Sequence, residues 1–432
     1  MPWLFVAGAF TVVAPLESAC SDDATSSSVP PAIDGGVTVD GASPPPVIPP
    51  VQEAGVDAGP VGVPDEACPL AAKTWMKSDF SGAIRSIVIR NSVYAIADDA
   101  KTNTMPLHAF GLASGEPAPT STRVECPPAE DVLFFPRLQT ARFDGAEQLF
   151  VSFPNASYAG PDGIIEAPGG LERVGPLDSP MPESVSFLEA TRGSVDGIFD
   201  SASGPLVLSW DALSSADGTL ATLVGAAGSE SLTNTQVFPS SASVVLRSEP
   251  LYFDGQLVAL LRATGLDDPS AVVYSGWPLL PSGPGEAVEL PGGYVTAALH
   301  DEQPFAYGLS SNGELVEVGL TASLTPTQRV VARLPQGYTV APGAIAQMAY
   351  TNGSVVLPAY KDGAPRILRV RLGTGSLDEW VAVIPDGAAF LGWSALAAGH
   401  GVVCTAMGTN EDGVERAGLH CGCLDGAFSH VP

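Results

Sequence analysis

A repeat of about fifty residues runs through most of this chain and limits the folds that it can adopt. Seven times, a turn-forming segment is followed by a short apolar stretch. The first apolar residues of these stretches are Val93, Leu149, Leu206, Leu257, Phe305, Val355 and Val402. Successive members are 47 to 57 residues apart. A repeat of this length is typical of folds in which each unit is one small supersecondary structure packed against its neighbours.

Each unit has the pattern of four short strands. In the fifth unit, apolar residues 295–299 precede Phe305, and two more strand-like segments follow at 313–320 and 327–334. Asn-Gly, Asp-Gly and Gly-His-Gly segments join the first two strands of a unit, which is the chemistry of tight hairpins. The 47 glycines and 40 prolines also favour turns over long helices. We therefore expect an all-β chain of about seven four-stranded antiparallel units.

The two ends of the repeat region predict how the units close. The last unit has no evident fourth strand, because only six residues follow position 426. A strand-like segment at 71–80 precedes the first unit and belongs to no other. We expect this N-terminal strand to complete the last unit and to close the ring, which would protect sheet edges from aggregation.

Residues 67–432 resemble a seven-bladed β-propeller in repeat length and strand pattern, but they match no particular propeller family. The Trp-Asp pair of WD repeats occurs once, at Trp210 and Asp211. The glycine doublets at 169–170 and 292–293 are not in register as kelch blades require, and the six tryptophans do not follow the pattern of quinoprotein dehydrogenases. The resemblance implies a fold and leaves the function open.

The N-terminus has the features of an export signal. Residues 2–16 form an uncharged apolar run, too short to span a bilayer but of the length of a signal-peptide core. Cys20 follows, and the composition then becomes polar, so residues 1–20 resemble a bacterial lipoprotein signal with Cys20 as the lipidated residue. The match departs from the pattern at Glu17, where Leu is usual, and in having no basic residue before Lys73. Ordinary secretion and a retained apolar N-terminus are the alternatives.

Residues 21–66 are rich in Pro, Gly, Ala and Asp and contain no aromatic and no basic residue. Such a segment cannot bury enough apolar surface to offset the entropy of ordering it, so we expect a disordered linker. Its prolines extend it into a spacer. We therefore expect an exported protein that is an outer-membrane or cell-surface lipoprotein, or is extracellular or periplasmic.

The charge of the chain excludes some partners. It has 47 acidic and 19 basic residues and a formal net charge of −28. Nucleic-acid binding needs clustered Lys and Arg, and the sequence has no such cluster. Anionic membranes would repel the chain, so we expect membrane contact only through an N-terminal lipid anchor. The acidity also keeps an exported protein soluble.

The cysteines predict disulfides, because an exported chain meets an oxidising environment. The six cysteines are Cys20, Cys68, Cys126, Cys404, Cys421 and Cys423. Cys404 is expected on the second strand of the last unit, so it could bridge to Cys421 or to Cys423 on the third. Cys68 could bridge to Cys126 or to the remaining cysteine of that pair, and an odd cysteine would be left over. A metal site at Cys421 and Cys423 would need further ligands that the sequence does not place nearby.

No catalytic motif is present, and we predict no catalytic residue, no metal ligand and no cofactor. His400 reads as a turn residue and His420 as a residue on a strand face. Acidic turns at 98–99, 267–268 and 410–413 could hold a structural calcium ion, although none follows a known loop pattern.

These features favour a monomeric, non-enzymatic propeller, tethered at the cell envelope, that binds or scaffolds a protein or a glycan. The alternative is a secreted carbohydrate-active hydrolase or lyase with acidic residues around a central channel. An enzyme would gather carboxylates or a histidine at one mouth of the channel, whereas a binding protein could expose an apolar or aromatic patch.

Overall fold

The computed structural model describes residues 67–431, with gaps at 81, 98–104, 118–121, 125–135, 154–155, 161–162, 168–169, 178–186, 190–193, 200–203, 211–217, 227–229, 239–244, 254–255, 265–271, 281–282, 285–287, 291–293, 300–304, 311, 321–325, 341–347 and 386. The predicted signal at 1–20 and the predicted linker at 21–66 lie outside these residues. The described residues form strands and turns, and none of them forms a helix that could cross a membrane.

The described strands form seven sheets of four or more strands, which we number in chain order. The first sheet contains β2 (Ile84–Ile89), β3 (Ser92–Ala97), β4 (Met105–Gly111) and β5 (Thr122–Val124). The second contains β6 (Arg137–Phe143), β7 (Ala146–Phe153), β10 (Gly170–Pro176) and β11 (Phe187–Glu189). A separate hairpin, β8 (Ala156–Gly160) and β9 (Gly163–Ala167), interrupts it between β7 and β10.

Three further sheets follow. The third contains β12 (Ser194–Phe199), β13 (Leu206–Trp210), β14 (Gly218–Val224) and β15 (Ser231–Phe238). The fourth contains β16 (Val245–Phe253), β17 (Gln256–Thr264), β18 (Val272–Leu280), β19 (Gly283–Pro284) and β20 (Val288–Leu290). The fifth contains β21 (Tyr294–Leu299), β22 (Phe305–Ser310), β23 (Glu314–Leu320) and β24 (Pro326–Arg333).

The last two sheets contain the C-terminal part of the chain and the first described strand. The sixth contains β25 (Tyr338–Val340), β26 (Ala349–Thr351), β27 (Ser354–Lys361), β28 (Ala364–Arg371), β29 (Leu377–Val381) and β33 (Ser429–His430). The seventh contains β30 (Ala389–Gly399), β31 (Val402–Glu411), β32 (Val414–Cys423) and β1 (Thr74–Phe80). The chain is therefore all-β, as its turn-rich repeat predicts.

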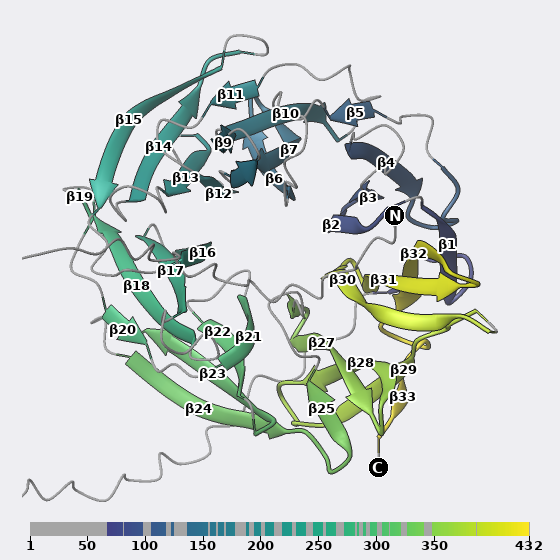
Figure 1. The fold of residues 1–432 in the computed structure, drawn as a ribbon. Coiled ribbons are helices and arrows are strands. Elements are labelled where there is room, and N and C mark those ends of the chain that lie inside the picture. Colours follow the sequence, from purple (N-terminus) through teal and green to yellow (C-terminus); the bar gives the residue numbers. More distant parts are fainter. Residues whose placement is uncertain are drawn as a thin grey trace, which may run out of the picture.

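The sheets follow one another around a common centre, which is the arrangement of a β-propeller (Figure 1). The strand of each sheet that lies nearest the centre comes early in its unit, and β26, β30, β2, β6, β12 and β16 contact each other in series. Side chains join these inner strands. Ser86 Oγ accepts a hydrogen bond from Leu138 N at 3.0 Å, and Gln139 Oε1 accepts one from Ile198 N at 3.2 Å. Polar groups on the inner strands thus satisfy backbone donors of the next sheet.

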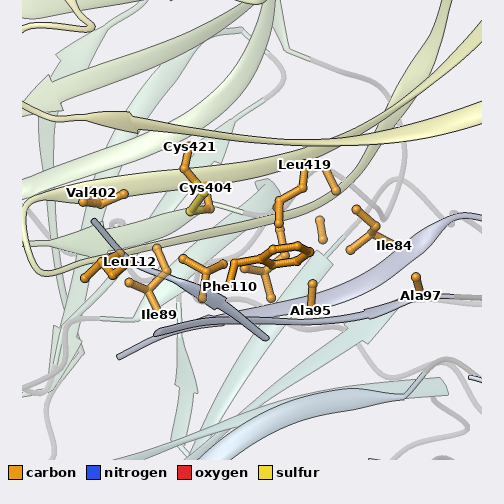
Figure 2. Close-up of a cluster of buried hydrophobic side chains, with 14 of the residues drawn as sticks. Ile84, Ile89, Ala95, Ala97, Phe110, Leu112, Val402, Cys404, Leu419 and Cys421 are labelled. Carbon is orange, nitrogen blue, oxygen red and sulfur yellow. A yellow bond between two sulfur atoms is a disulfide. The ribbon is translucent and has the colours of Figure 1, made fainter. Parts of the chain in front are cut away.

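The core lies between neighbouring sheets. Figure 2 shows the cluster between the first and seventh sheets, in which Ile84 and Ile89 of β2 and Phe110 of β4 face Cys404 of β31 and Leu419 of β32. Similar clusters lie between the second and third, the fifth and sixth, and the sixth and seventh sheets. Burial of one apolar side chain contributes about 1.5–3 kcal/mol, so each sheet is stabilised mainly by its neighbours.

The hairpin turns have the geometry that their sequences predict. Asp144, Asn352 and His400 connect a first strand to a second strand, and each has a φ of 43° to 51° and precedes a glycine that is also left-handed. Asp362 and Asp412 do the same between a second and a third strand. Two successive left-handed residues match the twist of paired strands.

The expected N-terminal strand at 71–80 is β1, which pairs antiparallel with β32 through Trp75 opposite Cys421. The last strand, β33, joins the sixth sheet, whereas β32, which precedes it in the chain, belongs to the seventh. It pairs with β29, where His430 lies opposite Asp378. Val431 N donates to Leu377 O at 2.9 Å. The C-terminal segment thus covers an outer sheet edge that would otherwise be open.

Candidate binding face

Six strand ends of the sixth and seventh sheets lie on one face of the molecule. The strands β27, β29 and β31 end there, and β28, β30 and β32 begin there, because neighbours in each sheet are antiparallel. The rings of Tyr360 near the end of β27 and Phe390 at the start of β30 lie 6.1 Å apart, so the two sheets meet at this face. We call it the distal face, because it lies at the opposite end of β32 from Cys423.

Aromatic side chains line the junction of the two sheets on the distal face. The ring of Phe390 contacts Tyr360 and also makes an edge-to-face contact with the ring of Trp393, with the two ring centres 5.1 Å apart. All three pack against one apolar cluster, in which Trp393 is buried and the other two are half-buried. Burial raises the pKa of Tyr360. Edge-to-face aromatic pairs stabilise a fixed geometry, so this surface is rigid.

Exposed valines lie at the same end of the two sheets as these rings. Val381 at the end of β29 is 51% exposed, Val383 is 56% exposed, and Val414 at the start of β32 is 54% exposed. Among the described residues, the only other exposed large apolar side chains are Met76 at 42% and Val330 at 48%. Ala382, between the first two valines, packs against the same cluster as the rings. The distal face therefore presents apolar surface of the kind that marks interaction sites.

Two buried polar atoms beside the rings have no hydrogen-bond partner in the described part of the chain. These are Trp393 Nε1 and Ser394 Oγ. Ser394 is the extra residue of an irregularity in the β30–β31 pairing between Trp393 and Ala395. Irregularities at similar places in β2, β12 and β21 leave Arg85, Asp196 and Val295 out of the register. Such bulges redirect side chains and are common next to functional sites.

One carboxylate contacts two cations of the sixth sheet at this end. Glu379 accepts a hydrogen bond from Tyr338 Oη at 2.7 Å and lies 3.5 Å from Lys361 Nζ and 3.6 Å from Arg366 Nε. Burial and the bond to Glu379 raise the pKa of Tyr338, and Lys361 Nζ also lies 5.0 Å from the centre of that ring. These groups form a network in which one carboxylate contacts two cations, so the network keeps one positive charge.

The hairpin tips of the distal face are acidic. Asp362 is exposed at the β27–β28 turn, and Glu411 and Asp412 are exposed at the β31–β32 turn. Arg416 lies 3.9 Å from Glu411, and both side chains are about half exposed, so the pair contributes little stability. The apolar surface is thus flanked by negative charge on both sheets.

The structure pairs four of the predicted disulfide cysteines. Cys404 is bonded to Cys421, the residue directly opposite it on β32, with their Cα atoms 4.1 Å apart. Cys68 is bonded to Cys423, with a Cα–Cα distance of 5.5 Å. Cys126 and Cys20 lie outside the described residues. The register of β31 and β32 thus selects one of the two bridges that the sequence left open.

The histidines are dispersed. His400 occupies a turn with a φ of 51°, and His420 is buried on β32, where loss of solvent lowers its pKa to about 4. His108 contacts the rings of Phe80 and Phe110, and His300 lies outside the described residues. His430 lies 3.4 Å from Asp378 at the C-terminal strand.

The acidic turns show no metal cluster where the structure describes them. No group of three His, Cys, Asp or Glu side chains is close enough to hold a metal ion in that part of the chain. In the turn at 410–413, Asn410 Oδ1 accepts a hydrogen bond from Gly413 N at 3.0 Å. The pairs at 98–99 and 267–268 lie outside the described residues.

Two features were missed from the sequence. The distal face could be found only after Tyr360, Phe390 and the exposed valines were placed side by side, because they lie in two repeats. The second feature is a buried ion pair between sheets, in which Arg173 Nε lies 2.6 Å from Glu230 Oε1 and both side chains are at most 6% exposed. Its only signal in the sequence was the adjacent pair Glu172 and Arg173 between apolar residues of β10.

No family model and no curated protein matches the chain. Solved structures with a similar arrangement include the β-propeller domain of Cps50 (Swd1) from Myceliophteria thermophila, at 9% identity and a TM-score of 0.47 over 80% of this chain and 99% of that one. Sqt1 from Saccharomyces cerevisiae has 9% identity and a TM-score of 0.45 over 79% and 86% of the two chains. The polysaccharide lyase Uly1 has 12% identity and a TM-score of 0.43 over 80% and 90%. Since all three scores are below 0.5, the fold assignment rests on the sheets of this chain.

Proposed function

We propose that this protein is an exported lipoprotein, anchored through Cys20, whose propeller binds a protein or glycan at the cell envelope without catalysing a reaction. In this proposal the seven sheets are seven blades, β1 closes the ring by completing the last blade, and residues 21–66 are the spacer to the membrane. The distal face is the binding surface.

The observation that carries the proposal is the position of the distal face relative to the base of the spacer. Cys68 is bonded to Cys423 at one end of β32, and Val414 lies at the other end of the same ten-residue strand. A strand of this length spans about 30 Å. A tether that leaves the domain at Cys68 would therefore be attached about 30 Å from the aromatic and valine surface and would leave that surface accessible.

A comparison of surface variants tests the proposal. The full-length protein, cross-linked in its own cell envelope, is recovered as wild type, as the double variant V381D/V383D and as V330D. Val330 is 48% exposed on β24, outside the distal face, and serves as the control for a new charge at an exposed valine. We expect one set of cross-linked protein or glycan to be lost from V381D/V383D and kept in V330D. Equal recovery from all three would refute the distal face as the binding surface.

The enzyme alternative has its own outcome in this design. A hydrolase or lyase would turn over polysaccharide, and its activity would depend on acidic residues at the channel and not on Val381 or Val383. Release of reducing sugar or of unsaturated product by wild type and V381D/V383D alike would replace the binding proposal with the enzymatic one.

A further inference from the structure

We propose that the occupant of the distal face is a cationic polypeptide segment that alternates basic and apolar residues. This inference rests on the proposed function and names the partner class for the same surface. Its evidence is the combination of three kinds of group in one place, namely exposed valines, half-buried aromatic rings and acidic hairpin tips.

The apolar groups define where a partner would lie. Val381 ends β29 of the sixth sheet, Val383 follows it, and Phe390 is the second residue of β30, the inner strand of the seventh sheet. These residues follow one another along the connection between the two sheets, so the surface is elongated. An extended peptide can place every second side chain on such a strip, because strand side chains alternate between faces.

The charges define the sign of the partner. Three basic side chains lie at this end, and each is near a carboxylate. Lys361 and Arg366 are both within 3.6 Å of Glu379, and Arg416 lies 3.9 Å from Glu411. The tips at Asp362 and Asp412 are exposed on either side of the apolar strip. The whole chain carries a formal net charge of −28, which adds a long-range field of the same sign. A basic partner is attracted by this field, whereas an acidic glycan or an acidic peptide is repelled.

The two acidic tips have one matched counterpart on the opposite face, Asp144. Asp362 and Asp412 each occupy the left-handed position before a glycine, with φ values of 50° and 52°. Asp144 has a φ of 51° and also precedes a glycine, but its turn joins β6 to β7 at the other end of the strands. Asn tolerates this backbone conformation, so Asp→Asn removes the charge at each tip with little strain.

The experiment measures binding of three probes to the full-length protein by fluorescence anisotropy at low and high salt. The probes are a labelled peptide of alternating lysine and valine, its glutamate–valine counterpart, and labelled soluble xylan. We expect the lysine peptide alone to bind, and D362N/D412N to weaken its binding by about twofold to thirtyfold at low salt, since each of the two exposed charge pairs contributes about 0.2–1 kcal/mol. We expect D144N to change it by less than about twofold, and high salt to weaken the wild type.

The outcomes separate this inference from the function on which it rests. Equal weakening per removed charge, in units of binding free energy, by D144N and by D362N/D412N would mean that only the overall charge attracts the peptide, and would overturn the inference. Xylan binding that V381D/V383D abolishes, without binding of the lysine peptide, would also overturn it while keeping the distal face as a binding surface. Insensitivity of every probe to V381D/V383D and to D362N/D412N would overturn both.

Discussion

The two disulfides close loops of very different length, which predicts very different contributions to stability. The Cys68–Cys423 bond joins residues 355 positions apart, and the Cys404–Cys421 bond joins residues 17 apart. A crosslink restricts the unfolded chain, and the entropy that it removes grows with the logarithm of loop length. At 25 °C this treatment gives about 6 kcal/mol for the long loop and about 3 kcal/mol for the short one.

The test replaces each pair by alanine and measures the free energy of unfolding in urea by tryptophan fluorescence. We expect C68A/C423A to lose about 3 kcal/mol more than C404A/C421A, because the first bond also fixes β1 against β32. C404A/C421A is the matched control, because it also removes one disulfide. It removes two fully buried sulfur atoms too, since Cys404 and Cys421 are both fully buried. An equal or larger loss in C404A/C421A would refute the reasoning that the long loop dominates.

Three further predictions concern the pairing and packing of the sheets. Deletion of residues 71–80 removes β1 and exposes β32, so we expect the whole domain to lose stability; cooperative melting at an unchanged temperature would contradict the closure by β1. The pKa of His420 is about 4 in the folded protein, below its unfolded value of about 6.5. The contribution of His420 to the free energy of unfolding is therefore complete above pH 6.5 and falls by about 3 kcal/mol as the pH drops to 4. We expect H420L to flatten the slope of the unfolding free energy against pH in this window. R173M leaves the Glu230 carboxylate buried without its guanidinium and should lower the free energy of unfolding by about 3–5 kcal/mol, measured by denaturation. The double variant R173M/E230L removes both charges and should recover most of this loss. A loss of stability in the double variant as large as in R173M would contradict the prediction.

Local features of the sequence were enough to predict the class of the fold. Turn pairs such as Asn352-Gly353 require two left-handed residues between paired strands, and this requirement depends only on neighbours in the chain. The apolar stretches around these turns predicted the strands, and the unassigned segment at 71–80 predicted β1. The lipid anchor, the spacer, the monomeric state and the absence of a cofactor are still predictions.

The site was less predictable, because it depends on contacts between repeats. The sequence narrowed the bridges of Cys404 to two partners, and only the register of β31 on β32 placed Cys421 opposite it. Likewise, Tyr360 and Phe390 belong to different units, and nothing in either unit indicates that their rings meet.

The sequence by itself thus determined that the chain forms short antiparallel strands at a regular spacing, because strand and turn propensities act over a few residues. Only the tertiary structure decided which edges are paired. The sequence predicted that the strand at 71–80 joins the last unit, but only the structure gave its register on β32. It also placed the C-terminal β33 on the sixth sheet beside β29. The physical reason is that the backbone of any free edge can bond to any nearby strand, so the choice depends on packing of the whole domain. The same packing brings the rings and valines of the distal face together.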